Sequence, residues 1–167
     1  MSILGPDSGS GQADPPNGGA PSAAGWLRDA DGSAYPPPPW RLEGDLYASV
    51  WLVPRAAVPP LPAEAIPATI AGRALVVTGW ALYAPGGVLA YREALCAVVL
   101  RAPRFPAITI THIWVDHPAS IAGGRALWSI PKTAGRFSGT PETGAEVTDA
   151  QGQPIAALNI VPGRALP

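Results

Sequence analysis

The only lysine of this 167-residue chain ends the segment Gly123-Gly124-Arg125-Ala126-Leu127-Trp128-Ser129-Ile130-Pro131-Lys132, in a sequence with ten arginines. Arginine is too basic to act as an amine nucleophile, whereas a lysine in apolar surroundings can lose its proton and attack a carbonyl. The alternative is a surface lysine that survives in a lysine-poor sequence. What surrounds Lys132 therefore decides between the two interpretations.

The segment is predicted to close a helix and continue as a stiff joint. Asp116 or His117 can cap the helix, and Pro118 suits its first position, so we expect a helix from there to about Trp128. The glycine pair 123–124 costs about 1 kcal/mol per residue in a helix, which indicates close approach to another element or a ligand. One side of the helix would carry Ile121, Arg125 and Trp128.

Lys132 follows directly on the joint. Ile130 precedes a proline and is pushed to extended geometry, and Pro131 has a fixed φ. A side chain on such a mount has a defined direction, which suits a reactive group.

Composition limits the remaining possibilities. Only 14% of residues are charged, while 22 prolines and 19 glycines favour short strands and loops within one domain. The net charge of −1 does not point to a nucleic acid or a membrane as a partner. Cys96 is the only cysteine and His112 and His117 are the only histidines, so we expect no disulfide, no metal and no other cofactor.

The first 34 residues are rich in glycine, serine and proline, with few large apolar side chains. They cannot bury enough surface to offset their ordering entropy, so residues 1–34 are predicted to be a disordered leader. A basic start before an apolar core is missing, so we expect a cytoplasmic protein without a secretory signal. Next, Tyr35-Pro-Pro-Pro-Pro-Trp40 is either a ligand for a proline-recognition domain or, as we favour, a stiff lead-in packed on the domain.

The middle of the chain predicts a hairpin. Residues 74–91 are uncharged over a length that suits a membrane span, but Ala84-Pro85-Gly86-Gly87 interrupts them as a type II turn would. The hairpin strands would be 75–83 and 88–100, and one helical turn near 63–65 would precede them. Further strands are predicted at Leu46–Val53, Ala107–Val115, Ala145–Asp149 and Pro154–Val161.

Two polar residues interrupt these apolar strands. Glu93 shares a strand face with Tyr91 and Leu95, where a charge needs a partner or a shifted pKa. It is either an ion-paired structural residue or the best acid/base candidate of the chain. His112 falls on the face of Ile108 and Trp114, and we expect it to be a core histidine.

Several of these residues together resemble the acetoacetate decarboxylase superfamily. The likeness covers roughly residues 35–161, and its most specific part is the segment that ends at Lys132. The other matching parts are Tyr35–Trp40, the strand Leu46–Val53, Tyr91-Arg92-Glu93, Asp116 and Ser120.

The resemblance implies a mainly β fold with a few short helices, built on an antiparallel, closed or cone-shaped barrel-like sheet over residues 35–167. It implies that Lys132 is the Schiff-base lysine and Glu93 the pocket glutamate, thirty-nine positions earlier. It also implies a small-molecule oxo-acid substrate and a homo-oligomer. We expect Arg125, Trp128 and Tyr91 to contact that substrate.

Three departures from the family bear on activity. The decarboxylases have a second lysine after the first, where this chain has Thr133; their first-strand arginine falls on Gly44, with Arg41 nearby. Family members also continue for roughly another half-domain, so this chain is expected to be a fragment or a reduced member.

The implied chemistry is decarboxylation of a β-keto acid through an iminium on Lys132. A lysine with the reference pKa of about 10.4 is neutral in roughly one molecule in two thousand at pH 7, so the site must favour the neutral amine. With Thr133 in place of a cation, we expect Trp128, Ile130 and Phe137, or Arg125, to have this effect. The alternatives are aldolase or dehydratase chemistry through the same Schiff base, or a non-catalytic binding domain with a Lys132–Glu93 ion pair.

Overall fold

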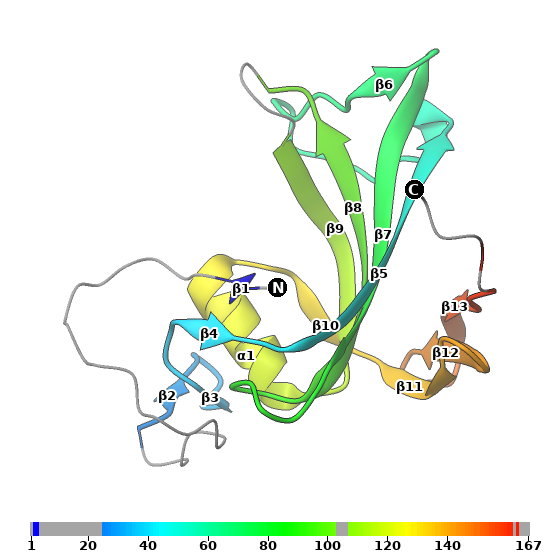
Figure 1. Ribbon diagram of the computed structural model, residues 1–167. Coiled ribbons are helices and arrows are strands. Elements are labelled where there is room, and N and C mark those ends of the chain that lie inside the picture. Colours follow the sequence, from blue (N-terminus) through cyan, green and yellow to red (C-terminus); the bar gives the residue numbers. More distant parts are fainter. Residues whose placement is uncertain (1, 4–24, 103–106, 162, 164–167) are drawn as a thin grey trace.

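The computed structural model describes residues 2–3, 25–102, 107–161 and 163, and its largest element is a six-stranded sheet (Figure 1). Its strands run in the order β10-β9-β8-β7-β5, and β6 pairs with the N-terminal end of β7. All neighbours are antiparallel except β10 and β9, which are parallel. The bounds are β5 Gly44–Val53, β6 Thr69–Ile70, β7 Arg73–Tyr83, β8 Tyr91–Leu100, β9 Ala107–Val115 and β10 Lys132–Ala134.

The long strands lie where the sequence predicts them, with shifts at the hairpin. β8 begins at Tyr91 rather than at Val88, because residues 84–90 form a connection tied to the segment before β5. Ala84 N donates to Glu43 O at 2.8 Å, and Val88 N donates to Arg41 O at 2.9 Å. Before β6, the short helix is the 3-10 helix η1, Arg55–Ala57, while residues 62–65 form only a hydrogen-bonded turn.

A separate three-stranded antiparallel sheet follows, made of β11 Arg136–Thr140, β12 Gly144–Thr148 and β13 Pro154–Leu158. Its side chains bury a second apolar cluster against the main sheet, in which the rings of Trp80 and Phe137 meet edge-on at 5.2 Å. The mainly β class is confirmed. The strand pairings of the described residues close no barrel, so the expected closed or cone-shaped barrel is not confirmed.

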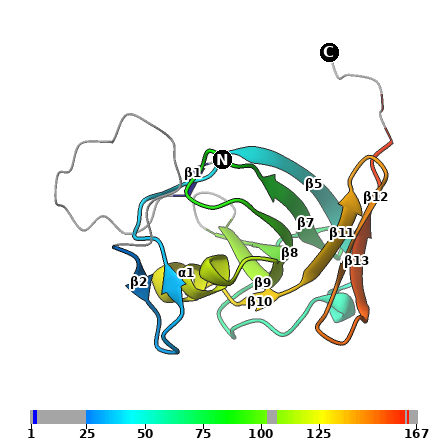
Figure 2. The same cartoon turned by 90° about the horizontal axis from the view of Figure 1, so that it is seen from below.

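The helix α1, Pro118–Trp128, covers the opposite face of the main sheet from β11–β13 (Figure 2). The predicted start is confirmed, because His117 is the N-cap and its ring accepts a hydrogen bond from Ala119 N at 3.2 Å. No helix in the described part of the chain has the length and apolar character needed to span a membrane.

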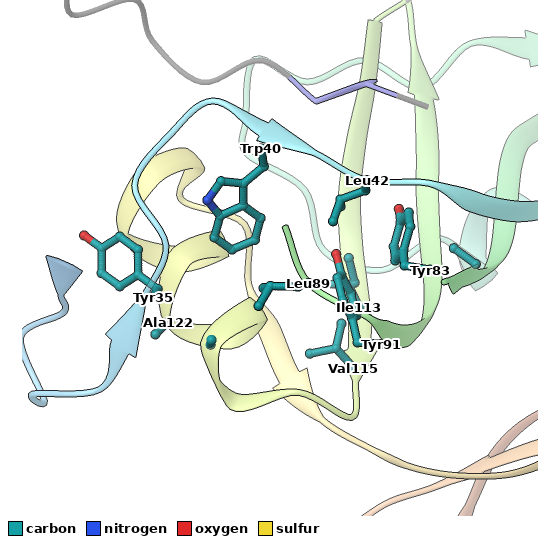
Figure 3. Close-up of a cluster of buried hydrophobic side chains, with 11 residues drawn as sticks. Tyr35, Trp40, Leu42, Tyr83, Leu89, Tyr91, Ile113, Val115 and Ala122 are labelled. Carbon is teal, nitrogen blue, oxygen red and sulfur yellow. The ribbon is translucent and has the colours of Figure 1, made fainter. Parts of the chain in front are cut away.

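The lead-in packs along α1, and Figure 3 shows Tyr35 on the outer side of the helix and Trp40 on the side toward Leu42 and Leu89. Tyr35 and Trp40 are both buried, which supports the packed lead-in that we favoured for the proline segment. A Cβ on Gly123 would lie 2.4 Å from the Trp40 ring, so the predicted close approach at this glycine is confirmed.

Short strands surround this lead-in: β1 Ser2–Ile3, β2 Leu27–Arg28, β3 Ala34–Tyr35 and β4 Trp40–Arg41. β1 pairs with β4, and β2 pairs with β3 across the expected boundary at residues 34 and 35. Most of the expected disordered leader, residues 4–24, lies outside the described residues, and the division into leader and domain stays a prediction.

Candidate active site

Lys132 is buried at the base of the main sheet with only 3% of its surface exposed. Its Nζ donates to Glu93 Oε2 at 2.7 Å, to Ser120 Oγ at 2.9 Å and to Tyr91 OH at 3.3 Å. The same Nζ lies 5.1 Å from the centre of the Tyr91 ring. Glu93 and Ser120 are also buried, at 5% and 0% exposure. The lysine is therefore a core residue, and the surface interpretation is wrong.

The end of α1 directs the lysine into this position. Ser129 adopts the left-handed conformation with φ of 54°, and Ile130 N donates to Gly124 O at 3.0 Å, which closes the last helical turn. The chain then reverses through Pro131 into β10, where Lys132 pairs with Ile113 of β9. Ile113 packs in the buried cluster beneath α1, and residues paired across two strands share a face, so Lys132 also faces the helix.

Gly124 makes room for the lysine stem. A Cβ at this position would lie 2.7 Å from Lys132 Cδ and 2.9 Å from Cε, so any larger residue would displace the side chain. The approach predicted for the glycine pair is thus confirmed at both positions, with Gly123 against Trp40 and Gly124 against Lys132.

Two tyrosine rings border the ion pair, and the centres of the Tyr83 and Tyr91 rings lie 4.6 Å apart with a tilt of 43°. Figure 3 shows these two rings beside each other. Burial, and next the charge of Glu93, raises the pKa of Tyr91 and of Tyr83 far above the ordinary value. Both hydroxyls therefore stay protonated well above neutral pH and can donate hydrogen bonds to the carboxylate.

The structure brings Lys132, Glu93 and Tyr91 together, but not the other two predicted site residues. Arg125 points its guanidinium at the backbone, where Nε donates to Lys132 O at 2.9 Å. Trp128 packs edge-on against Trp40 at 5.0 Å, and its buried Nε1 has no hydrogen-bond partner. No direct bond joins either side chain to Lys132 Nζ in the described part of the chain.

Phe137 was expected near the lysine, and this is wrong. Its ring packs with Trp80 on the opposite face of the sheet, under the guanidinium of Arg92 at 5.5 Å. Gly135, next to Trp114 and Val147, carries the chain across to that face.

His112 was expected in the core, yet it is exposed and stacks on Trp114 at 5.7 Å. His112 does share a face with Trp114, but a β-bulge on β9 moves Ile110 to the other face, because Cys96 pairs with His112 whereas Ala97 pairs with Ile110. The extra residue, Thr111, interrupts the two-residue alternation on which the prediction rested.

The residue that sequence reasoning missed is Ser120, which belongs to the family-like pattern but was given no role. It lies one helical turn before Gly124, and residues four apart share a face of a helix. The spacing of four residues between Ser120 and Gly124 is the sequence signal that could have identified this serine.

The opposite face of the sheet carries a cavity of about 550 Å³ between the main sheet and β13. Its lining contains three tryptophans and no aspartate, glutamate, lysine or arginine. A smaller hollow of about 450 Å³ lies at the end of the β7–β8 hairpin, and Tyr83 and Tyr91 form part of its wall. These tyrosines thus separate Lys132 from an open surface.

A metal is not suggested by the described residues, among which no three His, Cys, Asp or Glu side chains form a possible binding group. What the site offers is an amine, a carboxylate and two phenols in a water-poor setting. That set can exchange protons and can form a covalent bond to a carbonyl.

Comparisons with known proteins bear on the fold and the family of the chain. A comparison with curated proteins finds no match. Among solved structures, acetoacetate decarboxylase from Legionella pneumophila subsp. pneumophila str. Philadelphia 1 is similar, with a TM-score of 0.59 and 19% identity over 74% of this chain and 50% of that chain. The enduracididine biosynthesis enzyme MppR with HEPES buffer bound is similar too, with a TM-score of 0.56 and 20% identity over 90% of this chain and 64% of that chain.

These likenesses concern the fold, and the chain spans about half the length of the Legionella decarboxylase and less than two thirds of that of MppR. The sequence profile described as acetoacetate decarboxylase (ADC) matches residues 27–167, which include Glu93, Ser120 and Lys132. The chain therefore belongs to the acetoacetate decarboxylase family.

Proposed function

We propose that this protein is a Schiff-base-forming lyase that acts on a β-keto acid through Lys132. The observation that carries the proposal is the buried amine of the only lysine, 2.7 Å from a buried carboxylate. A buried ion pair often costs more in desolvation than it returns in attraction, so its retention in a core calls for a chemical reason.

In the proposed reaction, Glu93 first accepts a proton from the ammonium of Lys132. The neutral amine attacks the ketone carbon and forms a carbinolamine. Loss of water from the carbinolamine gives an iminium ion. The carbon–carboxylate bond then breaks, carbon dioxide leaves, and the bonding electrons move into the iminium to give an enamine. Protonation at carbon and hydrolysis release the ketone and restore the amine.

Thr133 is exposed and brings no charge to the site, so the repulsion that an adjacent cation provides is missing. In this chain we propose that proton transfer inside the Lys132–Glu93 pair takes its place. Two opposite charges in a low-dielectric site are disfavoured by desolvation, and one proton transfer converts both groups to neutral forms.

The same iminium supports a second reaction class. If an aldehyde meets the enamine instead of a proton, a carbon–carbon bond forms, as in aldolase or dehydratase chemistry. The chain covers only part of its structural relatives, so we commit to an oxo acid as the substrate class and leave the acceptor open.

A non-catalytic binding domain is the competing function. The direct Lys132–Glu93 ion pair is the observation that favours it, because a satisfied pair needs no substrate. In that case the pair would serve only to specify the packing of α1 on the sheet.

Trapping with borohydride separates these functions. The folded protein is incubated with a β-keto acid between pH 5 and pH 9, reduced, digested and mapped by mass spectrometry. We expect an adduct on Lys132 in the wild type and none in Lys132→Ala. A folded wild-type protein that forms no adduct anywhere in this range would leave the binding-domain function standing.

A further inference from the structure

Ser120 is the buried polar residue for which the family chemistry gives no role. It is the third residue of α1, and its side chain is fully inaccessible. Alanine is a better helix former, and a buried hydroxyl is costly unless it is hydrogen-bonded. The partner in this structure is Lys132 Nζ, 2.9 Å from Ser120 Oγ.

The three protons of the lysine ammonium meet three side-chain oxygens, which belong to Glu93, Ser120 and Tyr91. Tyr91 OH in turn lies 3.5 Å from the same Glu93 oxygen. A hydrogen bond from Ser120 also acts on the Tyr91 hydroxyl: it lowers the pKa of Tyr91 against the larger, raising effect of burial. Lysine, serine, tyrosine and glutamate thus form a ring in which each hydroxyl can accept one hydrogen bond and donate another.

We propose that Ser120 is a positioning residue that holds Nζ against Glu93 and sets the pH at which Lys132 becomes a neutral amine. The inference rests on the proposed function, since a neutral amine matters only if Lys132 attacks a carbonyl. An ammonium uses three acceptors, whereas a neutral amine has two protons and a lone pair. The Ser120 oxygen therefore stabilises the charged form.

The other groups around the amine come from each element packed against it. The groups that carry or can acquire charge are Glu93 and Tyr91 on β8, Tyr83 on β7, His117 beyond the Tyr91 ring, and Arg125 at the Lys132 carbonyl. Among these groups, Ser120 also acts on Tyr91, but the Tyr91 hydroxyl stays protonated well above neutral pH. A change in the titration of the amine below that range is therefore assigned to the serine hydroxyl.

The single lysine makes a direct test possible, because labelling with ¹⁵Nζ-lysine gives one side-chain signal. We expect the midpoint of its pH titration to fall by about one unit or more in Ser120→Ala, which is a tenfold larger neutral fraction below the midpoint. Ser120→Thr keeps the hydroxyl and should stay near the wild type. Ser120→Val has the shape of threonine without the hydroxyl and should behave like Ser120→Ala.

The matched control is Ser138→Ala, at an exposed serine of β11, for which no change is expected. Circular dichroism establishes that each variant is folded, and Ser120→Val serves if Ser120→Ala does not fold. Two results in a folded variant without the hydroxyl would overturn the assignment. One is a midpoint within about 0.2 pH unit of the wild type, which is about a fifth of the expected shift. The other is a midpoint that moves upward.

This measurement needs no substrate, so its failure is distinct from failure of the proposed function. If borohydride traps no adduct in the wild type, the lyase proposal fails whatever the titration shows. If the adduct forms but the titration of Ser120→Ala is unchanged, the lyase stands and the role given to Ser120 falls.

Discussion

The two faces of the main sheet differ in what they enclose. Beneath α1, an amine and a carboxylate are packed into a space with almost no access to solvent, and every proton of the amine has an acceptor. On the other face lies a cavity of about 550 Å³ whose walls carry no charged side chain. The ionisable side chains of the larger space are those of Tyr47, Cys96 and His112, whereas the paired amine and carboxylate lie where water is excluded.

This difference follows from strand alternation. Glu93 points to the α1 face, whereas its neighbours Arg92 and Ala94 point to the other side. Arg92 reaches Asp116 at 2.6 Å near the sheet edge, where both side chains are partly exposed. A charge pair near water contributes little to stability, and a buried pair is costly to break. The predictions below use that contrast.

The largest expected effect is on the α1 face. Glu93→Ala removes the counterion of a buried ammonium, and we expect a loss of about 3–5 kcal/mol in the free energy of unfolding. Glu146→Ala, at an exposed position of β12, is the control and should cost less than about 0.5 kcal/mol. Chemical denaturation measures both. Equal losses in the two variants would mean that the burial of Glu93 has no energetic consequence.

Next come the two glycines of α1. Gly123→Ala drives a methyl group into the Trp40 ring, and overpacking of this kind costs about 1–3 kcal/mol. Gly124→Ala meets only the flexible stem of Lys132, so we expect a smaller loss of stability but a larger loss in the rate of borohydride trapping. Denaturation and trapping rates of the two variants check this. A Gly124→Ala protein that is trapped as fast as the wild type would show that the glycine does not position the amine.

The tyrosines predict how stability depends on pH. Because burial raises the pKa of Tyr91 in the folded state, the unfolded chain loses this proton first as the pH rises above about 10. The folded state then binds more protons, and its stability falls by up to about 1.4 kcal/mol per pH unit for each such group. Denaturation between pH 8 and pH 11 should show a shallower decline in Tyr91→Phe. An unchanged slope would contradict the burial of its hydroxyl.

The smallest effect is expected on the cavity face. Thr78 accepts a hydrogen bond from Trp51 Nε1 at 2.8 Å, and Trp51 is 53% exposed. In Thr78→Val the indole can bond to water instead, so we expect a loss below about 1 kcal/mol by denaturation. A loss as large as that of Glu93→Ala would remove the contrast between the faces.

Local sequence rules predicted much of this arrangement. His117 and Pro118 started the helix as expected, and the glycine pair indicated two close contacts that the structure contains. Strand alternation placed Glu93 on the face of Tyr91, and the family likeness implied its partnership with Lys132.

The wrong predictions concern residues whose position depends on tertiary structure. The bulge at Thr111 moved Ile110 away from the face of His112 and left the histidine exposed beside Trp114, and no residue type in β9 predicts such a bulge. Phe137 lies on the face of the sheet opposite Lys132, because the chain crosses to that face at Gly135. Ser120 was missed because the side of α1 that faces the amine depends on how the helix docks, which its weakly amphipathic sequence leaves open.

The central claim is that the amine of Lys132 forms the Schiff base although it is buried. The single lysine allows an internal comparison with the N-terminal α-amine of the purified protein. After a short exposure to a β-keto acid and borohydride at pH 7, peptide mapping gives the rate of trapping at each amine. We predict faster trapping at Lys132 despite its 3% exposure. Trapping at the α-amine alone, in a folded protein, would contradict this claim.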